Sequence, residues 1–135
     1  MKLVGLRYLH ETLKRFVDSV IDDHKSCEID PSKIRDGESL ETNQIRLKHY
    51  VYDIFNSIVT SSGRCPQVMV DVFCALRDLA VETFPGNREV CYYVISGFVF
   101  LRFFAPAILN PMLFKLTDKS IVSFICFLSL LFFTF

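Results

Sequence analysis

The chain has 135 residues, 51% of them hydrophobic, with 15 basic and 15 acidic side chains. This length suits one small domain or part of a larger one, and the hydrophobic fraction is sufficient for a core. A net charge of zero disfavours a nucleic-acid surface, so no nucleic-acid partner is expected.

A first helix is predicted at the start of the chain. Apolar residues recur there at steps of three and four: Leu3, Leu6, Leu9, Leu13, Phe16, Val17, Val20 and Ile21. This is the period of an amphipathic helix. No capping residue precedes the pattern, so the helix is expected to have lost its natural beginning. Residues 22–39 then form a polar loop, with turn signals at Asp30-Pro31 and Asp36-Gly37.

Two further helical patterns follow the loop. The second helix has an apolar face of Ile45, Leu47, Val51, Ile54, Phe55 and Ile58. Gly63 is expected to end it in a left-handed conformation. Pro66 suits the first turn of a third helix. Its apolar face is Val68, Met69, Val72, Phe73, Leu76, Leu79 and Ala80, and the FPGN stretch at residues 84–87 ends it.

A fourth helix is predicted over about residues 88–104. It is apolar on much of its circumference, which indicates the central, most buried helix. Tyr92 and Tyr93 are interpreted as core, because no basic residues interleave with them to bind nucleic acid. The prolines at 106 and 111 are expected to end regular structure.

The final segment, 120–135, differs sharply in composition from the rest. Twelve of its sixteen residues are apolar and none is charged. As a helix it would span only ~24 Å, short of the ~30 Å hydrocarbon core of a bilayer. Four helical patterns and no convincing strand predict an all-α, bundle-like class.

The chain carries no recognisable catalytic motif of its own. The nucleophile elbow GxSxG and the phosphate loop are both absent from the sequence. The five cysteines are irregularly spaced, which indicates free thiols. His24 and Cys27 could ligate zinc, but no second pair of ligands accompanies them.

Arg102 stands inside the apolar stretch GFVFLRFFAPAILNP, residues 97–111. Its guanidinium has five donors and keeps its charge, so burial without acceptors would cost several kcal/mol. Backbone carbonyls of a neighbouring loop are the expected acceptors, which would pin that loop. The pinned loop either serves the fold alone or acts on a partner.

Four stretches resemble the Ras GTPase-activating protein domain. FLRFFAPAILNP is a specific match to its signature, and MKLVGLRYLHETLK is similar to the helix that follows its catalytic loop. CEIDPSKIRDGESLE, and Cys65-Pro66 with the helix after it, resemble the subfamily with flanking membrane-binding modules. The resemblance covers residues 1–118 as a partial domain and leaves 119–135 as a divergent apolar tail.

The resemblance implies an all-helical regulator that binds a Ras-family small GTPase in its GTP state and accelerates GTP hydrolysis. It implies no cofactor and no metal. Arg102 matches the second arginine of the family, which steadies the loop that carries the catalytic arginine finger. Leu101 would line the GTPase-binding groove, and Pro106, Ala107 and Ile108 would shape its floor.

The same resemblance implies that the chain lacks the finger. The finger loop should precede MKLVGLRYLHETLK, and Arg7 and Arg15 correspond to helix positions. The chain alone is therefore expected to be inactive. The alternative is a non-catalytic GTPase-binding fragment, or one that contacts membrane through the apolar tail. The expected location is the cytoplasm, peripherally at the inner face of the plasma membrane.

Overall fold

The computed structural model describes residues 2–119, with side chains from residue 4 onward. The elements, in chain order, are α1 (Lys2–Asp23), α2 (Leu40–Thr60), the 3₁₀ turn η1 (Ser62–Arg64), α3 (Gln67–Thr83), α4 (Arg88–Ser96), the π-helical η2 (Gly97–Phe104) and α5 (Ala105–Leu109). Every regular element in this part of the chain is helical, so the predicted all-α class is confirmed. The predicted tail, apart from Lys119, lies outside the described residues.

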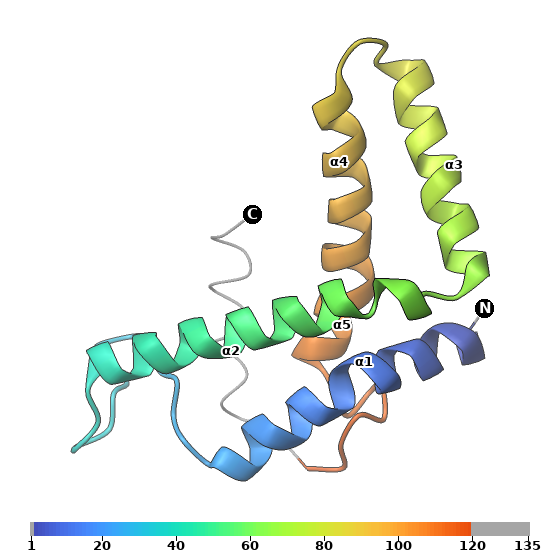
Figure 1. The fold of residues 1–135 in the computed structure, drawn as a ribbon. Helices are drawn as coiled ribbons and strands as arrows, with labels where there is room; N and C mark the ends of the chain where they lie inside the picture. Colours follow the sequence, from blue (N-terminus) through green and yellow to red (C-terminus); the bar gives the residue numbers. More distant parts are fainter. Residues whose placement is uncertain (1, 120–135) are drawn as a thin grey trace.

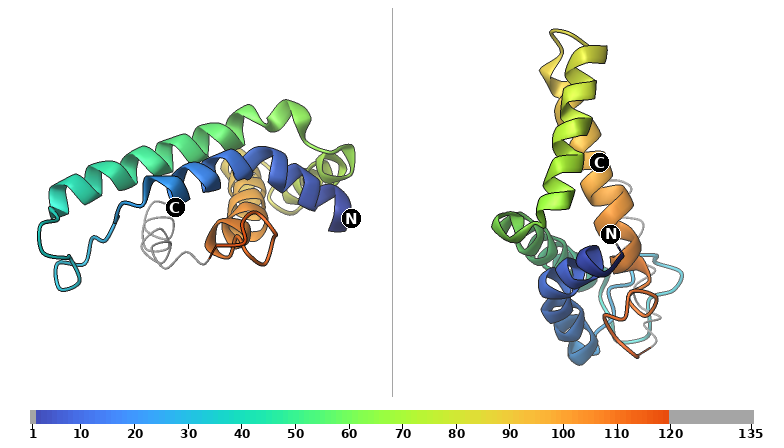
Figure 2. Two further views of the ribbon diagram at one scale, coloured as in Figure 1. Left: turned by 90° about the horizontal axis from the view of Figure 1, so that it is seen from below. Right: turned by 90° about the vertical axis from the view of Figure 1, so that its right-hand side faces the viewer.

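Helices α1 and α2 lie side by side and form a two-helix bundle (Figures 1 and 2). The pair is antiparallel: Tyr8, early in α1, bonds to Ser61 just after α2, whereas Asp23 at the end of α1 accepts a hydrogen bond from Tyr50. Helices α3 and α4 pack against each other as a hairpin that projects from this bundle, called here the arm. η2 and α5 continue α4 down to the bundle.

The hydrophobic core lies between α1, α2 and the end of the long helix. Its members are Tyr8, Leu9, Leu13, Phe16, Val17, Cys27, Leu47, Tyr50, Ile54, Ile58, Phe104, Ala107, Ile108 and Leu116. α1 and α2 supply most of them, as their apolar periodicity predicts. α3 and α4 supply none to this cluster, so the arm is held mainly by its own hairpin and by η2.

Local hydrogen bonds define the helix ends. Ser39 caps α2 by accepting from the Thr42 N–H, and Asn87 caps α4 by accepting from the Val90 N–H. The predicted turns at Asp36-Gly37 and in the FPGN stretch are confirmed, since Gly37 has φ +88° and Gly86 φ +85°.

The prediction for Gly63 was wrong. Positive φ among the glycines occurs at Gly37 and Gly86, and Gly63 instead lies in the 3₁₀ turn η1. The chain leaves α2 by tightening into this turn, in which the Arg64 N–H donates to the Ser61 carbonyl at 2.8 Å. A left-handed residue is therefore unnecessary.

The fourth helix was predicted to be the most buried, and it is not. α4 has no buried residue, and Tyr92 and Tyr93 are 73% and 70% exposed rather than in the core. The physical reason is that α4 stands away from the bundle and packs on α3 along one side only (Figure 1). Its apolar circumference indicated contact faces, but the described residues cover only one of them.

Pro106 was expected to end regular structure, yet the helix continues to Leu109. A proline in a helix lacks an N–H and crowds the carbonyl four residues earlier. Here η2 adopts the wider π-helical turn immediately before it, and the Ala105 N–H donates to the Phe100 carbonyl, five residues back. The wider turn accommodates Pro106 within the first turn of α5.

The continuous helix 88–109 is long and apolar enough to cross a membrane by length and composition. Its lower end, however, carries Phe104, Ala107 and Ile108, each at most 2% exposed within the bundle core. This lower end therefore belongs to the bundle core, whereas the α4 part of the helix lies outside it.

Candidate functional site

The candidate site is the segment from Gly97 to Pro111, where the long helix enters the bundle. Aromatic contacts hold it against α1: the ring centroid of Tyr8 lies 6.0 Å from that of Phe103 and 5.9 Å from that of Phe104. Phe103 and Phe104 also meet edge to face at 5.0 Å. These ring contacts pack the site against α1 and the core.

A buried hydrogen-bond chain supports the same corner. The hydroxyls of Tyr8 and Ser61 lie 2.7 Å apart, and the Ser61 hydroxyl donates to the Ile58 carbonyl at 2.7 Å. Burial raises the pKa of the Tyr8 phenol, while its bond to Ser61 opposes this shift. The tyrosine therefore stays protonated and joins α1 to the end of α2.

Arg102 is exposed, so the prediction that its guanidinium sits in the core was wrong. Within residues 2–119 it makes no hydrogen bond and no ion pair. The reason is its place on η2: it faces a hollow of about 200 Å³ between α1, α3 and η2. The hollow is lined by Val4, Gly5, Val68, Met69, Val72, Phe73, Phe98, Arg102 and Phe103. Arg102 thus lies beside the N-terminal end of α1 with its donors free.

The structure separates the other predicted groove residues into two kinds. Leu101 is 45% exposed, so its side chain is available to a partner. Pro106 is half-buried, whereas Ala107 and Ile108 are 0% and 2% exposed and belong to the core. Ala107 and Ile108 cannot contact a partner directly; they hold the segment that presents Leu101 and Arg102.

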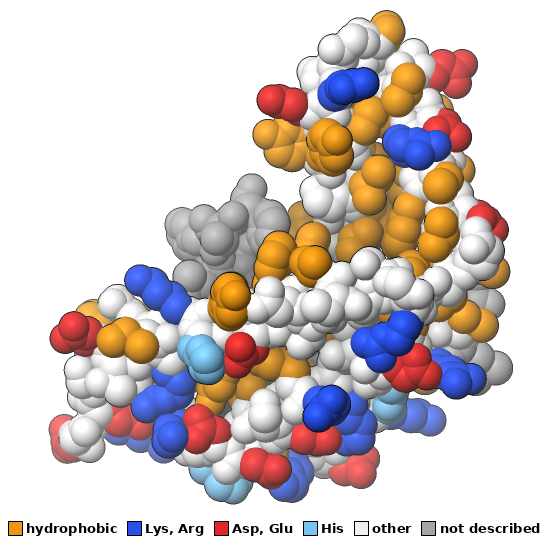
Figure 3. Space-filling model, in the orientation of Figure 1, with side chains coloured by type: hydrophobic (Ala, Val, Ile, Leu, Met, Phe, Trp, Pro, Cys, Tyr) orange, Lys and Arg blue, Asp and Glu red, His pale blue; other side chains and the backbone are white. Residues whose placement is uncertain are grey.

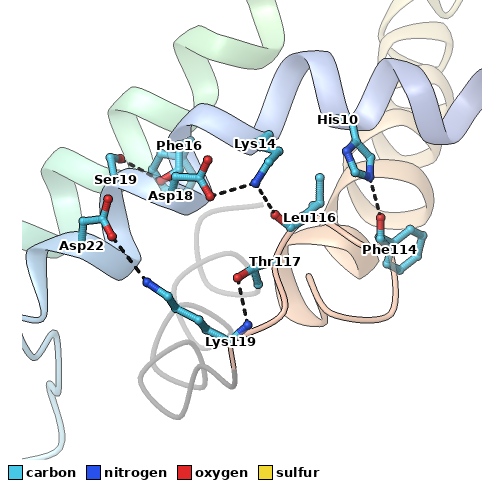
Figure 4. Close-up of polar contacts among 10 residues, drawn as sticks. All are labelled: His10, Lys14, Phe16, Asp18, Ser19, Asp22, Phe114, Leu116, Thr117 and Lys119. Carbon is cyan, nitrogen blue, oxygen red and sulfur yellow. Dashed lines mark hydrogen bonds and ion pairs between the residues drawn. The ribbon is translucent and has the colours of Figure 1, made fainter.

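Sequence reasoning missed the polar contacts that fasten the segment after α5 (Figure 4). His10 on α1 shares a hydrogen bond with the Phe114 carbonyl through its Nε2 at 3.0 Å, and Lys14 Nζ donates to the Leu116 carbonyl at 3.1 Å. Leu116 is fully buried between them. The available signal was the spacing of His10 and Lys14, four residues apart on one side of α1.

Charge is distributed unevenly over the surface. Charged side chains gather over the α1–α2 bundle, whereas hydrophobic side chains follow the outer edge of α2 and the arm (Figure 3). Within residues 2–119 no three His, Cys, Asp or Glu side chains cluster as metal ligands do, and Cys27 is a buried free thiol.

Comparison with known proteins decides the family. Residues 37–123, more than half of the chain, match RasGAP, described as GTPase-activator protein for Ras-like GTPase. This chain belongs to the RasGAP family. The predicted resemblance is thus confirmed, and the all-helical fold agrees with it. The predicted boundary at residue 118 stays a prediction.

Curated relatives of this RasGAP chain bear related names. It is 52% identical over 119 residues to GTPase-activating protein of Drosophila melanogaster, covering 88% of this chain and 10% of that protein. It is 52% identical over 117 residues to Ras GTPase-activating protein 3 of Rattus norvegicus, and this match covers 87% of the present chain and 14% of that protein. Ras GTPase-activating protein 2 of Homo sapiens is 49% identical over 116 residues, a match that covers 86% of the present chain and 14% of that protein. The chain spans 10–14% of these relatives' length.

Proposed function

We propose that this chain forms part of a surface that binds a Ras-family small GTPase in its GTP state and supports its GTP hydrolysis. The observation that carries the proposal is the FLRFFAPAILNP segment, anchored in the core through Phe104 and Ile108, with Leu101 exposed and Arg102 unpaired within the described residues. The chain is then a regulator, and the GTPase carries out the chemistry.

Arg102 acts in this proposal as a positioning residue. Its donors lie beside Val4 and Gly5, at the end of α1 that the finger loop precedes in the family resemblance. A guanidinium there can donate to backbone carbonyls of that loop and hold it. A held finger can then neutralise charge that develops on the transferred phosphoryl group, in a site that excludes water.

The finger itself comes, in this proposal, from a segment outside these 135 residues. Arg7 and Arg15 lie on α1, and Arg7 is paired with Glu11 at 2.8 Å. Arg35 lies in the loop between α1 and α2, at the end of the bundle opposite the N-terminus (Figure 1). The exposed Leu101 favours a second candidate, GTPase binding without stimulation, for the chain alone.

Single-turnover GTP hydrolysis by Ras tests the proposal. The chain is added alone, and beside it a fusion with the residues that precede the matching region in Ras GTPase-activating protein 3 of Rattus norvegicus. We expect acceleration by the fusion and none by the chain alone. Acceleration by the chain alone would show that one of its own arginines serves as the finger. No acceleration by either would reject the proposed activity.

A Leu101→Asp variant of the fusion tests the contact surface. A buried carboxylate in the interface should abolish GTPase binding, measured by fluorescence anisotropy of a labelled GTP analogue on the GTPase. Leu79→Asp on α3, at a position 60% exposed, is the matched control and should bind normally. Unchanged binding by Leu101→Asp would remove this residue from the surface.

The cellular setting belongs to the proposal as well. We propose a cytoplasmic protein recruited to the inner face of the plasma membrane, because the subfamily with flanking membrane-binding modules is the one its loop stretch resembles. Fractionation of the full-length protein checks this.

A further inference from the structure

The hollow of about 200 Å³ beside Arg102 lies at the base of the arm, where the starts of α1 and α3 come to the same end of the molecule (Figures 1 and 2). Among the residues that the structure describes, nine line it, and Arg102 alone of these has a polar side chain. Val4 and Val68, which also line it, are 48% and 49% exposed. The hollow is therefore an apolar recess that is open to solvent and carries one cationic group.

Ring contacts fix two walls of the hollow. Phe73 of α3 and Phe98 of η2 meet edge to face, with ring centroids 6.2 Å apart. Phe103 is stacked on Tyr8 of α1 on its other side, at 6.0 Å. Gly5 contributes no side chain to the lining, and a Cβ atom there would lie 3.4 Å from Cε2 of Phe103. The walls thus come from three elements that aromatic contacts join.

We propose that this hollow binds the anion of a short unbranched carboxylic acid, with its chain in the recess and its carboxylate on Arg102. A guanidinium presents two parallel N–H donors that match the two oxygens of a carboxylate. Within residues 2–119 Arg102 makes no hydrogen bond and no ion pair, so these donors are available. The ligand thereby supplies one negative group and an apolar body, which complement the lining in charge and in polarity.

A polypeptide segment matches the lining less well. Each residue of a peptide brings an N–H and a C=O, and both need partners when they are buried. Val72, Phe73 and Phe98 lie inside helices, where the backbone groups bond to one another. Arg102 has donors but no acceptor for a peptide N–H. The lining can therefore satisfy an acidic end group, but it offers no side-chain acceptor to a buried backbone.

The volume of the hollow limits the length of the chain. An apolar cavity of ~150 Å³ holds one benzene ring, which has six carbon atoms, so a hollow of about 200 Å³ holds about eight. Each methylene that enters the hollow should raise the affinity about fourfold. Methylenes beyond this length stay in water and should add little. The affinity should therefore rise from butanoate to octanoate and then level off.

An occupied hollow would also regulate the activity proposed above, and this consequence rests on that proposed function. The carboxylate would engage the donors with which Arg102 holds the finger loop. Octanoate should therefore reduce the acceleration of GTP hydrolysis by the fusion. Full acceleration at a concentration of octanoate that saturates the site would overturn this regulation. A fusion that fails to accelerate hydrolysis rejects the proposed function, while binding to the chain is still decided by the following titration.

Nuclear magnetic resonance of methionine methyl groups in the whole chain tests the site. Met69 lines the hollow, whereas Met112 is 46% exposed and lies outside it, so the second methyl group is an internal control. The chain is labelled with ¹³C at these methyl groups and titrated with octanoate, and Met69→Leu assigns the signals. We expect a saturable shift of the Met69 signal and little change at Met112. No shift at Met69, or equal shifts at both, would overturn the proposal.

Removal of the charge tests the carboxylate contact. Arg102→Met should weaken octanoate binding about threefold to fivefold, as expected for a solvent-accessible ion pair, and leave the binding of uncharged octanol unchanged. Arg88→Met removes an exposed charge at the start of α4 and should bind octanoate like the wild type. Equal affinities of Arg102→Met and the wild type for octanoate would contradict the assigned contact.

Filling of the recess tests the apolar walls. Val72→Trp on α3 should abolish the octanoate-induced shift, because the larger ring takes the space of the chain. Val81→Trp on the same helix, at a position 54% exposed, is the matched control and should bind normally. Circular dichroism verifies that both variants fold. Undiminished binding by a folded Val72→Trp would place the ligand elsewhere.

The chain-length series decides the proposal without any variant. An affinity that keeps rising about fourfold per methylene through dodecanoate would indicate adsorption to the surface rather than a site of this size. Loss of octanoate binding in the fusion, measured by calorimetry, would assign the hollow to the added residues. Conversion of a dimer to a monomer by octanoate, measured by sedimentation, would assign it to a second copy of the chain.

Discussion

The α1–α2 bundle and the α3–α4 arm are both built from amphipathic helices, but they are buried very differently. α1 places Leu9, Leu13 and Val17 at 3% exposure or less, whereas α3 has one buried residue, Ala80, and α4 has none. The bundle helices face each other and a third layer, from η2 to Leu116. The arm helices face mainly each other. An apolar pattern thus specifies that a helix has a contact face, while the packing of other segments decides whether that face is covered.

The largest expected effect compares one leucine from each region. Leu13→Ala in α1 empties a fully buried site and should lower the free energy of unfolding by about 3–4 kcal/mol. Leu79→Ala in α3, 60% exposed, should cost less than about 0.5 kcal/mol. Urea unfolding followed by circular dichroism measures both. Equal losses would show that the arm is as well packed as the bundle.

A buried polar anchor of the bundle gives the next effect. Asn43 is 1% exposed, donates from Nδ2 to the Glu28 carbonyl at 2.9 Å and accepts at Oδ1 from Arg46 at 3.2 Å. Asn43→Ala removes both of these hydrogen bonds from a buried position, so we expect a loss of about 1–3 kcal/mol in urea unfolding. Gln44→Ala, the exposed neighbour, is the control and should be close to neutral. An unchanged free energy of unfolding in Asn43→Ala would mean that water takes over the hydrogen bonds of the side-chain amide.

A third substitution should stabilise the bundle. The Thr12 hydroxyl is buried and makes no hydrogen bond with the described residues. Thr12→Val keeps the shape and removes the unpaired group, so the free energy of unfolding should rise by up to about 1 kcal/mol. Thr12→Ser keeps the hydroxyl and loses the methyl group, so it should be less stable than wild type. A destabilised Thr12→Val would reveal a partner for this hydroxyl.

The smallest effect is a pH dependence at the far end of the bundle. The Lys25 ammonium, 2.7 Å away, and then the Tyr50 hydroxyl hold the pKa of the Asp23 carboxyl below its usual value. A carboxyl with a lowered folded-state pKa contributes stability above its unfolded pKa, about 3.9, and loses it as pH falls through the folded value. Stability should therefore decline below about pH 4.

Unfolding midpoints should be measured below about pH 4, where the decline in stability should be smaller for Asp23→Asn than for the wild type. For Tyr50→Phe the decline should lie between those of the wild type and Asp23→Asn. Asp36→Asn, in the exposed loop, serves as the control and should leave the decline unchanged. An unaltered pH profile in Asp23→Asn would exclude this carboxyl as its source.

Several elements followed directly from local sequence. The three- and four-residue spacing of apolar side chains predicted α1, α2 and α3, and the FPGN stretch predicted the turn before α4. These are short-range effects: helical periodicity, capping by Asn87 and a left-handed glycine. The helix through Pro106 was not predictable in this way. A π-helical turn changes the pattern of backbone hydrogen bonds that a proline would otherwise interrupt.

The candidate site shows the same division. Leu101 was predicted to face a partner, and it is exposed; its role stays a prediction. Burial of Ala107 and Ile108, and exposure of Arg102, depend on which side of η2 and α5 meets α1. That choice involves residues about a hundred positions apart, such as His10 with Phe114 and Lys14 with Leu116.

By itself the sequence determined the helical class, most helix boundaries and, through FLRFFAPAILNP, the family to which the chain belongs. The tertiary structure alone decided which apolar faces are covered and where the guanidinium of Arg102 lies. The physical reason is range. Periodicity and capping act within a few residues of each other, whereas burial depends on segments that meet only after the chain has folded.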